Sequence, residues 1–182
     1  MTRDFFIAAI ASAFVTCFPN AVLADTAAEI SEKSKAALAS LVASNEGAKA
    51  IADEAVATLS FADIVKAGFL VGGQHGEGAL FKNNEAVAYY RSAAASYGLQ
   101  VGIQKFGYVL FFMNEGALEY LDTSDGWEIG IGPSLVVVDE GTARTLTSTT
   151  ARSDIYAFIF GQEGLMAGLG IQGTKMSSID PD

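Results

Sequence analysis

The sequence predicts an α+β domain in which N-terminal helices pack on a Gly-rich, strongly twisted antiparallel sheet that is partly barrel-like. Apolar residues recur at helical spacing over residues 25–59, and from Val65 onward they alternate with a period of two. In the alternating stretches, one face carries large apolar side chains and the other carries Gly and Gln. Because glycine weakens a strand, its repetition on one face indicates strong coiling, barrel-like closure, or a helix or ligand packed directly on the backbone.

The helical stretch divides into two amphipathic helices that are expected to pack on the sheet. The triplet Asn45-Glu46-Gly47 predicts a break and a new N-cap between them. An alternative places the first helix on a membrane, but its apolar face is rich in Ala, lacks Trp and Phe, and is not accompanied by a strongly basic face. The two apolar stripes are Ala27, Ile30, Ala37, Leu38 and Leu41, followed by Ala48, Ile51, Ala52, Ala55 and Leu59.

Turn and cap residues divide the rest of the chain. Asn83-Asn84 is typical of a hairpin turn, and Asn114 of the N-cap of a short helix. Residues 108–113 and 135–138 are continuous apolar runs, which predict buried strands. A last hairpin is expected to turn at Gln162-Glu163. Alternating strands are predicted around Leu99, Val101 and Ile103, around Trp127, Ile129 and Ile131, and around Leu165, Ala167, Leu169 and Ile171.

The N-terminus has the pattern of an export signal. Arg3 precedes an apolar run at residues 5–18, and Val22 and Ala24 suit cleavage before Asp25. The run is shorter than the about 20 residues that a spanning helix needs. The alternatives are an uncleaved anchor or a buried helix. We therefore predict a signal peptide at residues 1–24, one domain at 25–176 with a helical part at 25–60 and a sheet part at 64–176, and a flexible tail at 177–182.

The predicted export leads to an expected location in the periplasm or outside the cell, or peripherally on the outer membrane. Cys17 is the single cysteine, and Phe14 and Thr16 before it depart from a lipoprotein signal. Cleavage after Ala24 leaves a mature chain without a disulfide, a thiolate nucleophile or a cysteine metal site.

The charge balance excludes some partners. The 182 residues carry a formal net charge of −10, which argues against nucleic acid as a partner because phosphate binding needs a basic face. It also argues against simple electrostatic attraction to anionic membranes. An anionic ligand therefore needs a local basic patch.

The sequence predicts no catalytic residue, no cofactor and no metal. His75 is the only histidine, and with Glu77 it forms at most a weak metal site. With one histidine, neither Ser92 nor Ser96 has a plausible triad. The acidic residues Asp122, Asp125 and Glu128 cluster at a turn but fit no EF-hand loop.

Two glycine-rich strings also lack their chemical context. The string at residues 168–173 matches a dinucleotide fingerprint, but too few residues follow it for the required βαβ unit. The string at 72–78 lacks the Gly-Lys-Ser/Thr ending of a phosphate loop. Neither string predicts a nucleotide site.

A series of short motifs resembles the SYLF domain family over about residues 45–176. In order, the motifs are K-A-G-F (66–69), G-G-Q-H-G-E-G (72–78), S-Y-G-L-Q-V-G-I-Q (96–104), L-F-F-M (110–113), G-W-E-I-G (126–130) and G-L-M-A-G-L-G-I-Q-G-T-K (164–175). The resemblance implies lipid binding, with phosphoinositides as ligands of eukaryotic members and actin binding in some of them, and no catalysis. Where eukaryotic members tend to carry a Trp-Ser segment, this chain reads N-N-E-A-V-A-Y-Y.

The expected function is non-catalytic binding of a phospholipid or membrane surface by an exported protein, with a phosphoinositide-like headgroup included. The alternative is an envelope protein-interaction or structural module whose own helices cover the glycine face. A hydrolase is a third and least favoured hypothesis. Basic and tyrosine side chains near the glycine strands are the candidate lipid contacts, each against the simpler interpretation of surface charge or core: Lys66, Lys82, Arg91, Lys105, Tyr89, Tyr90 and Tyr97.

Overall fold

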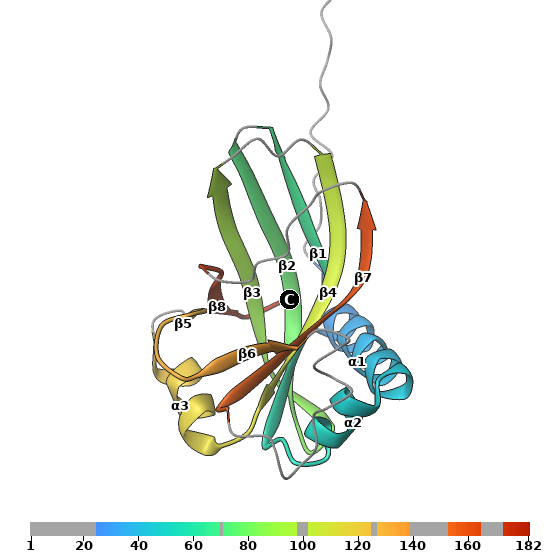
Figure 1. The fold of residues 1–182 in the computed structure, drawn as a ribbon, viewed down its shortest axis with the longest axis vertical. Coiled ribbons are helices and arrows are strands. Elements are labelled where there is room, and N and C mark those ends of the chain that lie inside the picture. The colour runs from blue at the N-terminus through green and yellow to red at the C-terminus, as the bar shows by residue number, and fades with distance from the viewer. Residues whose placement is uncertain (1–24, 70, 98–101, 125–126, 139–152, 165–172) are drawn as a thin grey trace, which may run out of the picture.

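The computed structural model describes residues 25–69, 71–97, 102–124, 127–138, 153–164 and 173–182. These residues form three helices and one eight-stranded mixed sheet with the strand order β5-β8-β3-β2-β1-β4-β7-β6 (Figure 1). The predicted α+β class with a partly barrel-like sheet is confirmed. The elements are α1 (Ala27–Ser44), α2 (Glu46–Ala52), β1 (Ala57–Phe69), β2 (Val71–Lys82), β3 (Glu85–Tyr97), β4 (Gly102–Phe112), α3 (Glu115–Thr123), β5 (Trp127–Glu128), β6 (Leu135–Val138), β7 (Ile155–Gly164) and β8 (Lys175–Ile179).

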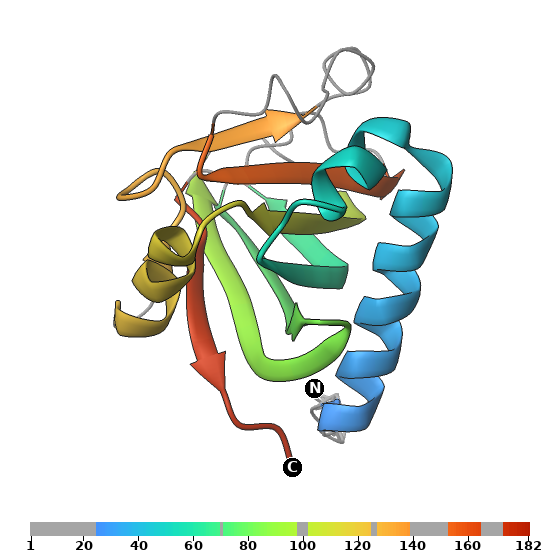
Figure 2. The same cartoon turned by 90° about the horizontal axis from the view of Figure 1, so that it is seen from below.

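The sheet curls because its two edge strands are consecutive in the chain. β5 and β6 lie at opposite ends of the strand order, yet only residues 129–134 join them. A segment of that length spans at most about 20 Å, so the edges must approach each other. The turn is held by a hydrogen bond from Trp127 Nε1 to the Ile131 carbonyl oxygen of 2.9 Å. Figure 2 shows the strands bent around a common interior.

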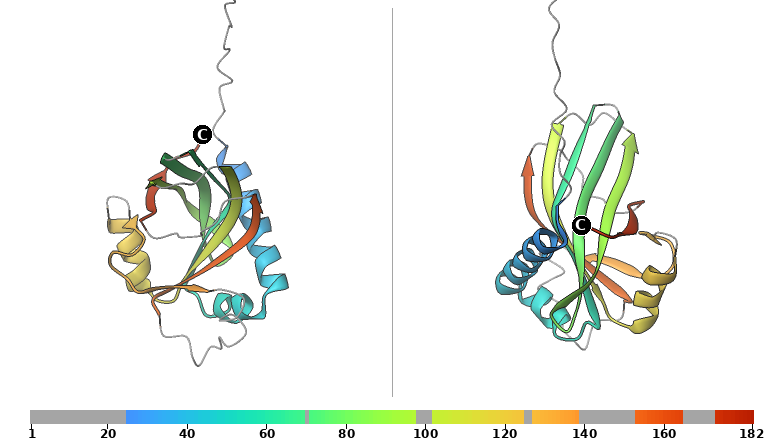
Figure 3. Two further views of the ribbon diagram at one scale, coloured as in Figure 1. Left: turned by 45° about the horizontal axis from the view of Figure 1, so that its top comes forward. Right: turned by 180° about the vertical axis from the view of Figure 1, so that it is seen from behind.

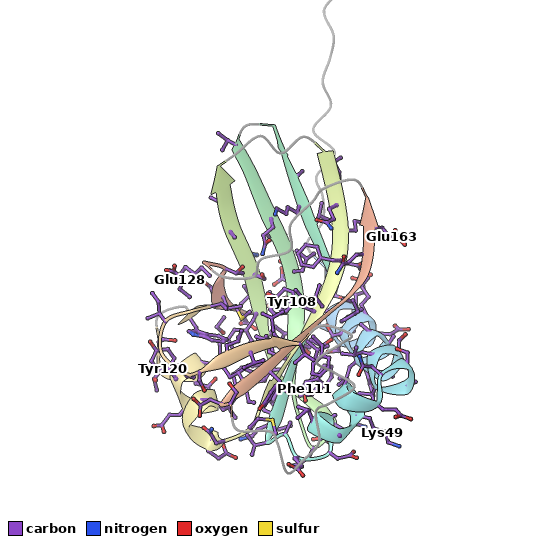
Figure 4. All side chains as sticks on the ribbon, in the orientation of Figure 1. Lys49, Tyr108, Phe111, Tyr120, Glu128 and Glu163 are labelled. Atoms are coloured by element: carbon purple, nitrogen blue, oxygen red, sulfur yellow. The ribbon has the colours of Figure 1, made fainter. Side chains whose placement is uncertain are left out.

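The interior of the curl holds the main core. It contains Leu59, Phe61, Tyr108 and Phe112, with Trp127 and the apolar face of α3. A second core lies on the outer face, where α1 and α2 cover Phe111 and Phe158, whose rings meet edge to face at a centroid separation of 5.6 Å. The run 108–113 therefore supplies both faces of the sheet, which confirms its predicted burial. Figure 4 places Tyr108 and Phe111 in this densely packed part.

The helices begin where capping side chains permit it. Thr26 and Glu29 form a capping box at α1, and the Asn45 side chain accepts from the Ala48 amide at α2, which confirms the predicted break. The prediction that the second helix continues to Leu59 is wrong. The Val56 amide donates to the Phe112 carbonyl oxygen at 2.8 Å, so the chain joins the sheet there, and Leu59 is fully buried in β1.

Coiling of β1 explains the glycines. Its pairing with β4 shifts register between Phe61 and Ile64, and the bulge brings its backbone against β2 and β4. A Cβ on Gly76 would meet the Asp63 carbonyl oxygen, and one on Gly78 would meet the Ser60 carbonyl oxygen. Strong coiling, one of the three predicted explanations, therefore accounts for glycine at these two positions.

Local turn predictions are confirmed, but two predictions about longer strands are wrong. Asn83 and Asn84 have φ of 50° and 67° and close the β2–β3 hairpin, and Asn114 caps α3. The predicted turn at Gln162-Glu163 is instead part of β7, because Gly161 (φ 62°) absorbs a register shift as a bulge. The strand at 135–138 exists, but it pairs only with β7, in parallel, and forms a half-exposed edge.

The segment expected to be a loose tail is also partly in the sheet. β8 includes Ser177 and Ile179, and it pairs with both β3 and β5. Only Trp127 and Glu128 of the strand predicted around Trp127 are extended, and Ile129 lies in the following turn. The strand predicted at residues 165–171 lies outside the described residues, as do Leu99 and Val101.

The sheet has two parts, which differ in whether helices pack against them. We call residues 65–69 of β1, 71–75 of β2, 93–97 of β3 and 102–105 of β4 the distal sheet. Figure 1 and the right panel of Figure 3 show its strands extending past the three described helices. None of these helices has the length and apolar character needed to cross a membrane. The convex face of the distal sheet continues the side covered by α1, and its concave face continues the interior.

Candidate functional site

The convex face of the distal sheet carries exposed apolar side chains. Val65, Val71 and Ile103 are 40%, 55% and 64% exposed. Strand pairing places small residues between them, since Ala67 lies opposite both Ile103 and Gly73. A contiguous exposed apolar surface of this kind is the signature of a binding surface rather than of an isolated surface residue.

Basic side chains border this face on the side toward the helices. The strand registers align one row across the sheet, in which residues on neighbouring strands share the convex face. The row contains two lysines and the histidine at its centre, with Glu163 at the β7 end: Lys175, Ala93, His75, Val65, Lys105 and Glu163. In a chain of net charge −10, this row is a local excess of cations.

A groove of about 520 Å³ runs where α1 meets the bare face. Ile30, Val65 and Ala67 contribute apolar lining, and the charges at its rim are mostly paired. Lys33 donates to Asp25 at 2.6 Å, and this bond raises the lysine pKa. Arg91 and Glu77 form a second pair at 3.1 Å. The groove therefore extends the apolar face under α1, and Asp63 adds an acidic side chain to its lining.

The concave face at the same level is polar. Lys66 pairs with Gln74 on β2 and with Gln104 on β4, and their side chains are 8%, 7% and 4% exposed. Gln74 Nε2 donates to Thr174 Oγ1 at 3.0 Å. Below this row, Tyr108 Oη donates to Ser92 Oγ at 2.7 Å, and burial raises the tyrosine pKa. The distal sheet thus presents opposite chemistry on its two faces.

The structure does not bring the four predicted basic residues together. Lys105 and Arg91 lie on the convex face, whereas Lys66 faces the concave interior. Lys82 ends β2 at the far hairpin and pairs with Glu115 at 3.3 Å. One phosphate group therefore cannot be held by all four.

The predicted tyrosines occupy packing positions. Tyr89 lies under α1, and its hydroxyl hydrogen-bonds the Ser31 hydroxyl at 2.9 Å. Tyr90 is buried on the concave side and donates to Asp122 at 2.8 Å, and burial raises its pKa. The side chain of Tyr97 lies outside the described residues.

Sequence reasoning missed the bare apolar residues and Lys175. The two-residue periodicity correctly places Ile103 and Gln104 on opposite faces of the strand, but it does not show which of the two side chains points into the interior. The buried member is Gln104. The available signal was charge spacing: Lys105 follows Ile103 by two residues and so shares its face.

The described residues offer no cluster of metal ligands. Among them, no group of three or more His, Cys, Asp and Glu side chains is arranged to hold a metal ion. His75 lies exposed on the convex face, Glu77 is paired with Arg91, and Asp125 lies outside the described residues.

Residues 93–180 match the model of the Ysc84 family, which is described as Las17-binding protein actin regulator. Over these residues, which are slightly less than half of the chain, the protein is similar to the Ysc84, or SYLF, family. The match runs from within β3 to the end of β8, and it confirms the resemblance drawn from the motifs. No curated protein matches the chain. The family's description is that of a binding protein, which supports a binding domain in this part of the chain.

Proposed function

We propose that this SYLF domain binds the surface of a lipid bilayer through the convex face of its distal sheet. The observation that carries the proposal is the bare apolar face formed around Val65, Val71 and Ile103, next to Lys105 and Lys175. Apolar side chains that remain in water in a folded domain gain free energy when they enter the acyl boundary of a membrane.

The size of the face supports reversible, peripheral binding. Fully burying one Val or Ile side chain is worth about 1.5–3 kcal/mol, so three partly exposed ones supply about 3 kcal/mol in total. A lysine near an anionic surface adds about 1 kcal/mol. These free energies together correspond to weak association with the membrane surface and not to insertion of the domain into the bilayer.

The charge distribution supports an anionic phospholipid over a neutral one. Lys105 and Lys175 flank the apolar residues in a chain whose net charge is −10. Binding to anionic vesicles should therefore weaken with salt more steeply than binding to neutral ones. The predicted signal peptide would bring this face to phospholipids of the cell envelope, as a periplasmic or secreted protein or one held peripherally at the outer membrane.

Co-sedimentation with phosphatidylcholine vesicles and with phosphatidylcholine–phosphatidylglycerol vesicles tests the proposal. The protein should bind the anionic vesicles more strongly. Ile103→Asp places a carboxylate at the centre of the face and should reduce binding about tenfold or more. Val136→Asp is the matched control, because Val136 is exposed on β6, away from the distal sheet, and should leave binding within about twofold.

Absence of binding to either vesicle type contradicts the proposal and favours the protein-interaction module. Equal losses in the two variants would also contradict it, because the effect would then come from added negative charge and not from the distal face.

A further inference from the structure

His75 lies at the centre of the convex face, and the proposed function does not assign it a role. On β2 it is paired with Val65 of β1 on one side and with Ala93 of β3 on the other. Directly paired residues on antiparallel strands project from the same face. The imidazole therefore lies beside Val65, one of the exposed apolar side chains, and reaches a bound surface together with it.

Small residues flank the imidazole of His75. Ala93 is its neighbour on β3, and Gly73 precedes it by two residues and so shares its face of β2. A Cβ added to Gly73 would meet only the Ala94 carbonyl oxygen, at 3.6 Å. His75 is exposed, and it forms no hydrogen bond within the part of the chain that the structure describes. Both of its ring nitrogens are therefore available to a ligand.

The charged side chains around His75 balance one another. Lys105 and Lys175 of the same row each lie two strands away, at about 10 Å for a strand spacing of about 4.8 Å. This separation exceeds the Debye length of about 8 Å at physiological ionic strength, so the lysines oppose a proton on His75 only weakly. The row, the groove lining and their salt-bridge partners contribute four cations and four anions: Lys33, Arg91, Lys105 and Lys175 against Asp25, Asp63, Glu77 and Glu163. A proton on His75 therefore changes the charge of this group from zero to positive.

We propose that His75 contacts the anionic headgroups of the bilayer, and that its protonation strengthens membrane binding as the pH falls from about 8 to about 5.5. The inference rests on the proposed membrane function and names the residue that makes it pH-dependent. Histidine is the side chain that ordinarily changes its charge within this range, whereas carboxyl groups ordinarily titrate near pH 4, about two units below histidine. The change in charge over the range is therefore assigned to the imidazole.

The size of the effect follows from one added charge. A basic side chain near an anionic surface is worth about 1 kcal/mol, which corresponds to about a fivefold change in affinity. An imidazolium also donates from both ring nitrogens, whereas a neutral imidazole donates from one, and a phosphate oxygen accepts such a charge-assisted hydrogen bond. We therefore expect binding to anionic vesicles to be about fivefold stronger at about pH 5.5 than at about pH 8, with a smaller change for neutral vesicles.

Co-sedimentation of the purified chain with phosphatidylcholine–phosphatidylglycerol vesicles at constant ionic strength tests the inference. The phosphodiester of phosphatidylglycerol is ionised throughout the pH range, so a change in binding comes from the protein. His75→Gln should reduce the ratio of binding at about pH 5.5 to binding at about pH 8 from about five to below about two. His75→Lys carries a permanent charge, so it should also lose the pH dependence, and at about pH 8 it should bind about fivefold more strongly than the wild type.

A second measurement follows the imidazole directly. His75 is the only histidine of the chain, so in protein prepared without a histidine tag one imidazole signal in the proton NMR spectrum reports its titration. If the protonated form binds anionic headgroups about fivefold more tightly, linkage requires the midpoint of the titration to rise by about 0.7 pH unit when phosphatidylglycerol bicelles are added. A midpoint that stays in place while the chain binds the bicelles would overturn the inference.

A histidine placed elsewhere is the matched control. Val136→His in the His75→Gln background puts an imidazole on the exposed edge strand β6, away from the distal sheet, and should not restore the increase at low pH. An increase that His75→Gln retains, or that Val136→His restores, would overturn the inference and leave the membrane function in place. Absence of vesicle binding at every pH would contradict the membrane function itself, and this inference with it.

Discussion

The two ends of β4 lie in opposite surroundings. Phe111 and Phe112 are fully buried at one end, whereas Ile103 is 64% exposed at the other. The exposed end alternates polar or small residues with apolar ones, and the buried end is apolar throughout. The difference is that α1, α2 and α3 cover only one end (Figure 3). Helices from distant parts of the chain pack on one end of the strand, and this packing decides which end becomes core and which remains a surface for binding.

The largest expected effect compares these two ends directly. Phe112→Ala should lower the free energy of unfolding by about 3–5 kcal/mol, because it removes a ring that packs against Trp127 at a centroid separation of 6.2 Å. Ile103→Ala should lower it by less than about 0.5 kcal/mol. Urea denaturation measures both values. A similar loss at both ends would show that the distal face is covered in solution.

The glycines of β2 allow the same comparison within one strand. Gly78→Ala should destabilise the domain by about 1–3 kcal/mol, because its Cβ would press on the Ser60 carbonyl and the Phe61 ring. Gly73→Ala meets only the Ala94 carbonyl oxygen at 3.6 Å and should stay within about 0.5 kcal/mol of wild type. Thermal unfolding of the two variants measures the difference in stability. If Gly73→Ala destabilised the domain as much as Gly78→Ala, coiling at the β1 bulge could not explain the glycine at position 78.

The boundary between the two regions is marked by the hydroxyl of Tyr108. Tyr108→Phe should cost about 1–3 kcal/mol at neutral pH, because the buried Ser92 hydroxyl loses its described donor. Burial raises the Tyr108 pKa, so folding favours the neutral phenol. Its stabilising contribution is complete below the ordinary tyrosine pKa of about 10 and is lost as the pH rises above it.

Urea midpoints measured from about pH 8 to 11 test this sign. The wild-type chain should lose stability above about pH 10 more steeply than Tyr108→Phe, by up to about 1.4 kcal/mol per pH unit. Parallel curves for the two proteins would place the Tyr108 hydroxyl in contact with water.

The smallest effect concerns the hairpin at the packed end of β2 and β3. Asn84 has a φ of 67°, so Asn84→Ala should cost about 1 kcal/mol, whereas Asn84→Gly should be neutral or slightly stabilising. Both can be measured by thermal unfolding. An alanine variant as stable as the glycine variant would show that the turn relaxes to another conformation.

Features set by nearby residues were predictable from the sequence. The Asn45 and Asn114 caps and the Asn83-Asn84 turn follow from side-chain chemistry within three residues. Strand order is different, because it depends on pairing between segments far apart. The runs 108–113 and 135–138 are equally apolar, but one is central and the other is an edge, and only the register of β7 with both decides this.

The sequence predicted which stretch of the chain contains the candidate site, but not which of its side chains share one face of the sheet. The stretch containing Lys66, Gln74 and Lys105 was singled out for its glycines and its basic residues. Which side chains share a face depends on the β1–β4 register, in which Lys66 lies opposite Gln104 and not opposite Lys105. A shift of one residue would exchange the faces, and no local signal in the sequence fixes that register.

The position of β8 has a consequence for synthesis. β8 is the last of the described strands to leave the ribosome, yet it lies between β5 and β3 in the sheet. Until residues 175–179 have emerged, β3 has an open edge and β5 has no neighbour to join. The nascent chain therefore cannot complete its sheet until residues 175–179 have been synthesised.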